Sequence, residues 1–229
     1  MRIAISIISV IALAIVSIFS LPALGDLTAD YWSVQGDQFF LNGSYEKAAA
    51  SYEKALELNS SDVTLWINKG KALANLERYE DAIACFDQAL VVNSTNVEAL
   101  NFKGMALSQG LQNYDQAIAV LDKALRLNPE YADAWTGKGM ALANAGRLPE
   151  SLVCFEEAVK ISPQDPTVWN NKGVALREQG NYQEALSCFD KAIGLNPSYE
   201  VARKNRQFTL QDINQNSDAV SRLSTVEVL

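Results

Sequence analysis

Large and small apolar residues recur along this chain with a period of about 34 residues. A tryptophan, replaced once by leucine, returns at Trp32, Trp66, Leu100, Trp135 and Trp169. A glycine follows four residues later each time, at Gly36, Gly70, Gly104, Gly139 and Gly173. Further columns of small and large residues run in step with these two, for example Ala48, Ala82, Ala117, Ser151 and Ala185. Agreement of several columns over five units indicates an internal repeat.

Within each unit, the apolar positions predict two helices. Counted from the first residue of a unit, positions 4, 8 and 11 share one helical face, and positions 20, 24 and 27 share another. A turn rich in Gly and Asn separates them, and an Asn-Pro pair such as Asn196-Pro197 ends the second helix. Because one hairpin alone would leave apolar surface exposed, neighbouring hairpins are expected to stack.

This pattern resembles the tetratricopeptide repeat family, whose aromatic, Gly, Ala, Phe, Ala and Pro positions are best seen in the last unit. The matching residues there are Trp169, Gly173, Ala185, Phe189, Ala192 and Pro197. The repeats are expected at 29–62, 63–96, 97–131, 132–165 and 166–199, together 29–199. The resemblance implies an all-α fold, a right-handed α-solenoid of five helix hairpins with the first helix of each lining a concave face. Lysine departs from the family pattern just before four of the glycines, at Lys69, Lys103, Lys138 and Lys172.

Two segments flank the predicted repeats on the C-terminal side. Residues 200–212 resemble the capping helix that commonly ends such arrays, with Val201, Ala202 and Phe208 expected to face inward. Residues 213–229 lack hydrophobic periodicity, and we expect them to form a flexible tail.

The N-terminal residues 1–25 predict export. Arg2 is their only charge, an apolar run spans residues 3–21, and small residues follow Pro22. This is typical of a secretory signal peptide, although the run is also nearly long enough to span a membrane. A cleaved signal and an uncleaved membrane tether both remain open, and both place the repeats outside the cytoplasmic membrane, either extracellular or in the cell envelope.

The implied concave face gives a candidate binding site. Helical geometry places positions 2, 5, 9, 12 and 13 of each first helix roughly opposite its packed face, with position 6 beside them. The candidate peptide-binding residues are Asn68, Lys71, Asn75, Asn101, Met105, Gln109, Thr136, Met140, Asn144, Asn170, Asn171, Val174 and Glu178. Asparagine both donates and accepts hydrogen bonds, so it suits the backbone of a peptide or helix. The alternative is a set of merely solvated polar residues.

One known variant of the family binds C-terminal carboxylates through Lys, Asn and Arg. The corresponding positions here include Ser33, Asp37, Glu98 and Phe102, and only Asn68 fits. A carboxylate clamp is therefore disfavoured.

Composition excludes several other functions. The chain has no histidine, which rules out histidine-dependent catalysis and histidine-ligated metal. Its net charge is −8, which disfavours nucleic acid as a partner. Cys85, Cys154 and Cys188 form no CxxC pair and are expected to be buried free thiols. No cofactor or metal site is predicted, and the protein is not expected to be an enzyme.

Taken together, the sequence favours a non-catalytic scaffold that binds a protein or peptide. The alternative is a self-associating structural component of a cell-envelope complex. Export would also make three Asn-x-Ser/Thr triplets candidate glycosylation sites, at Asn42, Asn59 and Asn93.

Overall fold

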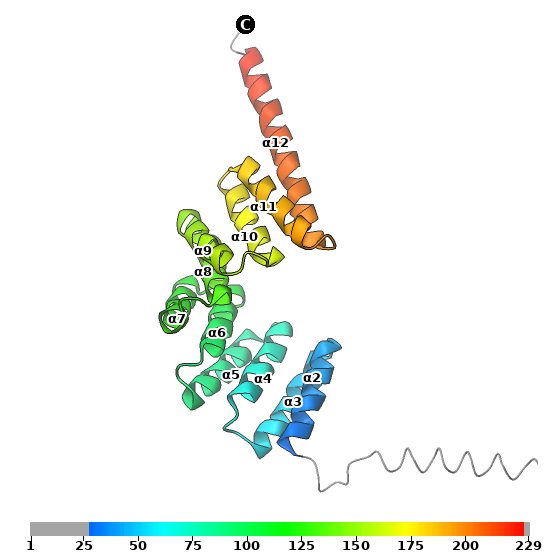
Figure 1. The fold of residues 1–229 in the computed structure, drawn as a ribbon, viewed down its shortest axis with the longest axis vertical. Coiled ribbons are helices and arrows are strands. Elements are labelled where there is room, and N and C mark those ends of the chain that lie inside the picture. The colour runs from blue at the N-terminus through cyan, green and yellow to red at the C-terminus, as the bar shows by residue number, and fades with distance from the viewer. Residues whose placement is uncertain (1–27, 227–229) are drawn as a thin grey trace, which may run out of the picture.

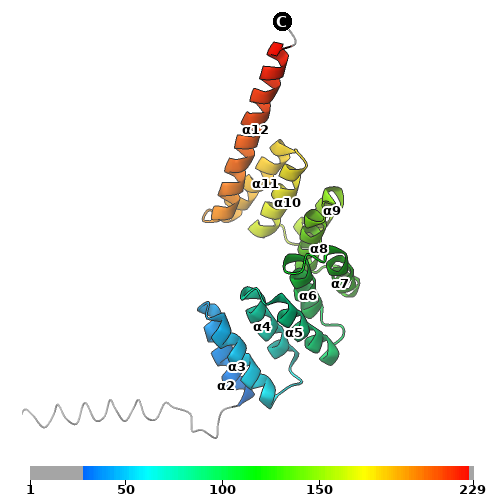
Figure 2. The ribbon, with the colours of Figure 1, turned by 180° about the vertical axis from the view of Figure 1, so that it is seen from behind.

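The fold is a curved stack of helix hairpins (Figures 1 and 2). The computed structural model describes the backbone of residues 28–226 and the side chains of residues 28–215. Eleven α-helices and no strands occur in that range. Their bounds are α2 Ala29–Leu41, α3 Tyr45–Leu58, α4 Val63–Asn75, α5 Tyr79–Val92, α6 Val97–Gln109, α7 Tyr114–Leu127, α8 Ala132–Asn144, α9 Leu148–Ile161, α10 Pro166–Glu178, α11 Tyr182–Leu195 and α12 Glu200–Val226. The all-helical class and the predicted hairpins are confirmed.

Local sequence signals set the start of the first helix in a repeat. The Asp62 carboxylate accepts hydrogen bonds from the backbone N–H groups of Thr64 and Leu65, at 2.8 and 3.3 Å. Such a cap satisfies donors that the first helical turn leaves free. The recurring tryptophan then fixes the preceding turn, because the indole of Trp66 donates to the Ser60 carbonyl at 2.9 Å. The indoles of Trp135 and Trp169 donate in the same way to the backbone carbonyls of Pro129 and Pro163, six residues earlier.

Each hairpin closes around a glycine that faces one large side chain. Phe86 of α5 lies against Gly70 of α4 so closely that a methyl group at Gly70 would be 2.5 Å from the ring. The other four repeats make the same pairing, at 2.5 to 2.8 Å. The large residues of this column are no more than 2% exposed. Small residues opposite bulky ones therefore set the distance between the two helices.

The lysines that depart from the family pattern have a structural role between repeats. Lys103 of α6 pairs with Asp87 of the preceding helix α5 at 2.6 Å, and Lys138 of α8 pairs with Asp122 at 2.6 Å. The same pairing over 16 residues joins Lys69 to Glu53, Lys172 to Glu156 and Arg206 to Asp190. These ion pairs bridge the repeat junctions and are partly exposed, so each contributes modestly to stability.

Polar substitutions mark the two ends of the array. Inner first helices bury alanine at position 10, including Ala72 and Ala141 at 0% exposure, whereas α2 has exposed Gln38 there. Helix α12 occupies the place of a sixth first helix and buries Ala202 and Thr209 against the array. No second helix follows α12 in the described range, so α12 covers the last hairpin as a cap.

The C-terminal helix differs from the prediction in two respects. It is a single helix through Val226, so residues 213–226, expected as a flexible tail, continue the capping helix. Ala202 faces inward as expected, but Val201 and Phe208 are 50% and 48% exposed. The hydrophobic pattern indicated a helix there, but it did not show which apolar residues the array would cover.

The cysteines are buried and unbridged, with exposures of 5%, 4% and 6% for Cys85, Cys154 and Cys188. Burial raises the pKa of Cys85 and of Cys154 to about 11, and it raises the pKa of Cys188. Because the thiolate is the reactive form, a raised pKa lowers reactivity at pH 8.

We therefore expect a maleimide reagent at pH 8 to label the folded protein on the order of 100-fold more slowly than the urea-unfolded chain. Mass spectrometry over a time course measures the labelling of each cysteine separately. Rapid labelling of any of the three in the folded protein would contradict the burial.

The predicted signal peptide or tether at 1–25 lies outside the described residues. Within residues 28–226, no helix combines the length and apolar character needed to cross a membrane.

Candidate functional site

Successive first helices contact one another directly, as α6 does with α8 and α10 with α12, and they form the inner side of the curve. On these helices the described residues form two separate hollows. The larger one involves α2, α4 and α6, and we call it the N-terminal groove. It consists of two adjoining cavities of about 380 and 350 Å³ that share Phe40 and Lys71. Its lining residues are Asp37, Phe40, Leu41, Tyr52, Asn68, Lys71, Ala74, Asn75, Glu77, Tyr79, Phe86, Phe102, Met105, Ala106 and Gln109.

Apolar side chains form the walls of the N-terminal groove. Phe40 comes from the last turn of α2, and Phe102 comes from α6, two repeats further on. Phe102 stacks on the buried ring of Phe86, with centroids 5.9 Å apart and planes at 21°. Leu41 extends from the end of α2 and is 85% exposed. The groove therefore presents partly exposed aromatic surface together with the exposed side chain of Leu41.

Two of the three charged residues that line this groove, Asp37 and Lys71, are already engaged, whereas Glu77 has no side-chain hydrogen bond or ion pair among the described residues and makes the groove acidic. Asp37 accepts hydrogen bonds from the Tyr52 hydroxyl at 2.7 Å and from the Asn68 amide at 3.5 Å. Burial, followed by the bond to Asp37 and its charge, raises the pKa of Tyr52, so this tyrosine remains a donor. Lys71 pairs with Glu98 at 3.9 Å and lies 5.0 Å from the centre of the Phe102 ring. A ligand carboxylate would have to compete with Glu98 for Lys71.

The second hollow, the C-terminal groove, lies between α8 and α10. It measures about 130 Å³ and is lined by Met140, Ala143, Asn144, Phe155, Asn171, Val174, Ala175 and Glu178. The Asn171 amide points toward the Met140 sulfur at 3.8 Å. This smaller groove offers a thioether, an aliphatic group and amides, with Glu178 at its exposed edge.

Ten of the thirteen candidate residues line these two grooves. The N-terminal groove contains Asn68, Lys71, Asn75, Met105 and Gln109, and the C-terminal groove contains Met140, Asn144, Asn171, Val174 and Glu178. Thr136 lines neither groove, and its hydroxyl donates to the Ala132 carbonyl of its own helix at 3.0 Å. Whether any ligand binds these residues stays a prediction.

The structure corrects the placement of Asn101 and Asn170, which are buried at 2% and 4% exposure. Both occupy position 5, which faces the next first helix instead of the open groove. Asn170 accepts a hydrogen bond from Asn205 of α12 at 2.9 Å. Asn101 lies against α8, where a side chain at Gly137 would come within 3.2 Å of its Oδ1 atom. These two residues belong to helix–helix contacts.

Asn101 has an unsatisfied group within that contact. Its Oδ1 atom is buried without a hydrogen-bond partner, and its amide nitrogen lies 3.8 Å from the Met105 sulfur. The equivalent residue in the second repeat is Ile67, which is 2% exposed. A buried polar group without a partner costs free energy, whereas an apolar group of similar size does not.

Replacing Asn101 by isoleucine is therefore expected to raise the unfolding free energy by about 1 kcal/mol. Urea denaturation followed by circular dichroism measures the change, with exposed Asn144→Ile as the matched control. A loss of stability in Asn101→Ile would show that the buried amide contributes favourably to the contact between α6 and α8.

Sequence reasoning missed the aromatic part of the N-terminal groove. Phe40 occupies position 12, one of the inner positions considered, and Phe102 occupies position 6. Both could have been found by reading apolar residues at those positions as exposed ligand contacts. Tyr79 could not, because it comes from the start of a second helix and reaches the groove only through the packing of α5 on α6.

Other candidate sites are placed as follows. Asn42, Asn59 and Asn93 are exposed residues that follow the C-terminal ends of α2, α3 and α5. The side chains of Asn59 and Asn93 accept hydrogen bonds from the hydroxyls of Ser61 and Thr95, both at 2.9 Å. Among residues 28–215, no group of three acidic or sulfur ligands is arranged to hold a metal ion.

Comparison with known proteins agrees with the fold. Three family models match the chain. Two are described as tetratricopeptide repeat, one matching residues 63–96 and 166–199 and the other residues 108–166. The third, described as TPR repeat, matches residues 36–77. No curated protein sequence matches the chain.

Several solved structures are similar. TTC0263, a TPR protein of Thermus thermophilus, superposes with a TM-score of 0.73 at 20% identity, over 80% of this chain and 100% of that one. YrrB, described as a TPR protein with an unusual peptide-binding site, shares 30% identity over 78% of this chain and 92% of its own, with a TM-score of 0.55. MamA shares 25% identity over 75% and 95% of the two chains, with a TM-score of 0.58. The repeat spacing, the glycine-to-aromatic packing and these matches establish that the chain belongs to the tetratricopeptide repeat family.

Proposed function

We propose that this protein is a non-catalytic scaffold that binds a peptide or helix of another protein in its concave grooves. The observation that carries the proposal is the partly exposed apolar wall of the N-terminal groove, formed by Phe40 and Phe102 from different repeats. An aromatic or aliphatic side chain of a ligand gains most by burial at such a wall. The amides of Asn68, Asn75 and Gln109 lie in the same groove and are suited to a ligand backbone.

The acidic character of the groove defines the expected ligand further. Asp37 is held by two donors and Lys71 is paired with Glu98, whereas the Glu77 carboxylate has no partner among the described residues. A peptide with an apolar anchor next to a basic residue therefore fits better than one ending in a free carboxylate. The peptide-binding site named in the description of YrrB is in keeping with this class of function.

Selection of a displayed random-peptide library against the full chain tests the proposal. We expect the enriched peptides to share an apolar or aromatic anchor, and Phe102→Glu to weaken their binding at least about 10-fold, because it places a charge in a desolvated contact. Val153→Glu is the matched control, since Val153 is 56% exposed on α9, away from both grooves. Equal binding to Phe102→Glu and to the control variant would exclude the groove as the site.

We further propose that the array acts outside the cytoplasmic membrane. The support is the leader pattern of residues 1–25, with Arg2 before the apolar run at 3–21. Protease added to intact cells or spheroplasts is expected to digest the full-length array, and deletion of residues 1–25 is expected to protect it. An array that stays protected with its first 25 residues in place would contradict export.

A further inference from the structure

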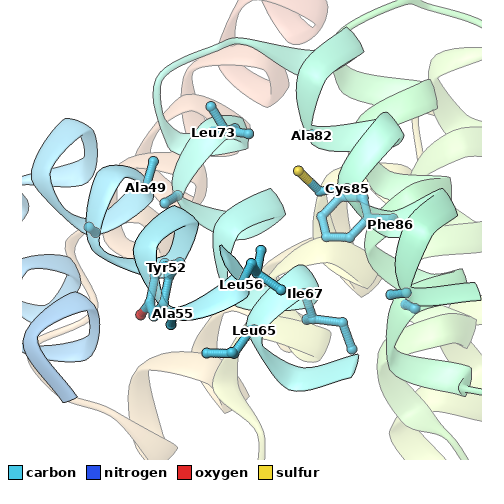
Figure 3. Packing of buried hydrophobic residues seen from close by; sticks show 14 of the residues in the cluster. Ala49, Tyr52, Ala55, Leu56, Leu65, Ile67, Leu73, Ala82, Cys85 and Phe86 are labelled. Atoms are coloured by element: carbon cyan, nitrogen blue, oxygen red, sulfur yellow. The ribbon is translucent and has the colours of Figure 1, made fainter. Parts of the chain in front are cut away.

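A third hollow lies on the opposite side of α4 from the N-terminal groove, between α3 and α5. Its volume is about 480 Å³, larger than that of either cavity in the N-terminal groove. Leu73 of α4, Ala49 of α3 and Cys85 of α5 are among its lining residues, and Figure 3 shows Leu73 between the other two. Exposed Ala50 and Ala84 belong to its walls. We call this site the α3/α5 hollow.

One substitution within the repeat pattern accounts for the hollow. Ala49 stands at position 21, where the other four repeats carry Ile83, Ile118, Leu152 and Leu186. At the next junction Ile83 packs on the core that includes Leu107, the equivalent of Leu73. Leu152 packs in the same way on the core that includes Leu176. Alanine is shorter than isoleucine or leucine, so it leaves a space beside Leu73 at the first junction, although Leu73 itself is only 4% exposed.

The rim of the hollow combines satisfied ion pairs with one unpaired acid. Lys69 pairs with Glu53, and Arg78 binds Asp81 through two nitrogens at 2.8 and 2.6 Å. Glu46, in the first turn of α3, makes no hydrogen bond or ion pair among the described residues. A ligand for this site should therefore present apolar groups together with a basic residue.

Helix α12 carries such a combination on one exposed face. Val201, Lys204 and Phe208 are separated by three and four residues, so they lie along one side of the helix. Val201 and Phe208 are half exposed, and Lys204 is exposed without an ion-pair partner among the described residues. The neighbouring Arg203 and Arg206 are already paired, with Glu200 and Asp190. In this acidic chain, the first turns of α12 are thus a basic, amphipathic segment.

We propose that two copies of this chain associate head to tail, with the Val201–Lys204–Phe208 face of α12 in one copy docked into the α3/α5 hollow of the other. Phe208 fills the space that Ala49 leaves above Leu73, and Lys204 meets Glu46. The two surfaces lie at opposite ends of the array and differ from each other, so the contact is heterologous and can continue from copy to copy. In the acceptor copy it leaves the N-terminal groove open, because that groove lies on the other side of α4.

Site-specific photo-crosslinking of two differently tagged full-length copies tests this contact. The donor copy carries benzoylphenylalanine at position 208 together with Ala49→Ile, so that only its α12 can take part. The acceptor copy is either wild type or Ala49→Ile. We expect irradiation to join donor to wild-type acceptor within residues 46–50 or 81–85, and the yield to fall at least about fivefold with the Ala49→Ile acceptor.

Ala49→Ile is expected to fold, because isoleucine or leucine occupies this position in the other four repeats. Its urea midpoint, measured alongside, should be no lower than that of the wild type. A charge exchange provides a second readout, in which Glu46→Lys in the acceptor lowers the yield and Lys204→Glu in the donor restores it.

The proposal is overturned if no donor–acceptor crosslink forms, if it forms at other residues, or if acceptor Ala49→Ile leaves its yield unchanged. These outcomes are independent of the peptide-binding function, because the crosslink is measured without a peptide and the α3/α5 hollow lies on the other side of α4 from the N-terminal groove.

Discussion

Replacing Phe86 by alanine is expected to lower the unfolding free energy of the array by about 3 to 5 kcal/mol. The ring is 1% exposed, and it lies against Gly70 on one side and stacks with Phe102 on the other. Its removal leaves a cavity that glycine cannot fill, at the centre of one hairpin and next to the junction with the following one. In a repeat array, the loss of one interface is felt by both neighbours.

Urea denaturation followed by tryptophan fluorescence and by circular dichroism measures the loss. Phe208→Ala is the matched control, because Phe208 is 48% exposed and its removal should cost less than about 1 kcal/mol. The two probes should be compared directly, since long repeat arrays can depart from two-state unfolding. Similar midpoints for Phe86→Ala and Phe208→Ala would contradict the packing described for the hairpin.

Replacing Gly110 by valine is expected to destabilise the array by about 2 to 3 kcal/mol. Gly110 follows α6 with φ −88° and ψ −49°, a conformation open to any residue, so backbone strain is not the cause. The cause is the Tyr79 ring of α5, because a Cβ atom at Gly110 would lie 2.0 Å from its Cγ atom. The base of an aromatic ring cannot move aside as the end of a flexible side chain can.

Gly194→Ala provides the matched control, because nothing lies within 4 Å of a Cβ atom added at that helical glycine. Alanine there should raise stability by up to about 1 kcal/mol through its better helix propensity. The melting temperatures of the two variants should thus shift in opposite directions. Tolerance of valine at position 110 would mean that α5 and α6 are not packed as closely as the structure shows.

The residues at the two ends of the array disfavour self-association by stacking one array onto the next. The outer face of α2 presents Tyr31 and Gln38 where inner helices bury small or aliphatic residues. In helix α12, Arg203 stands at the position of the packed tryptophan or leucine of the other first helices, and Gln207 stands at the position of their glycine. Neither end suits another hairpin, so head-to-tail contact through the α3/α5 hollow is the better route to assembly.

The site was predictable only in part, for a geometric reason. Helical periodicity assigned inner positions at 100° per residue, and ten of the thirteen residues chosen line a groove. The prediction that Asn101 and Asn170 line the groove was wrong, because position 5 lies at the border of the inner face and the next first helix covers it. How far a neighbouring helix covers a border position depends on the angle between repeats, which one helix considered alone does not contain.

By itself, the sequence determined the repeat length, the number of hairpins and the residues that pack within each hairpin. These features follow from local periodicity and from pairs of positions about 16 residues apart, such as Gly70 and Phe86, so a single chain segment specifies them. Only the tertiary structure decided where the surface stays open. The Phe40–Phe102 wall joins residues of repeats one and three, and the α3/α5 hollow appears only when Ala49 and Leu73 of adjacent repeats are placed together. Such openings depend on the relative placement of whole hairpins, because a cavity is defined by the atoms missing between elements and not by any one of them.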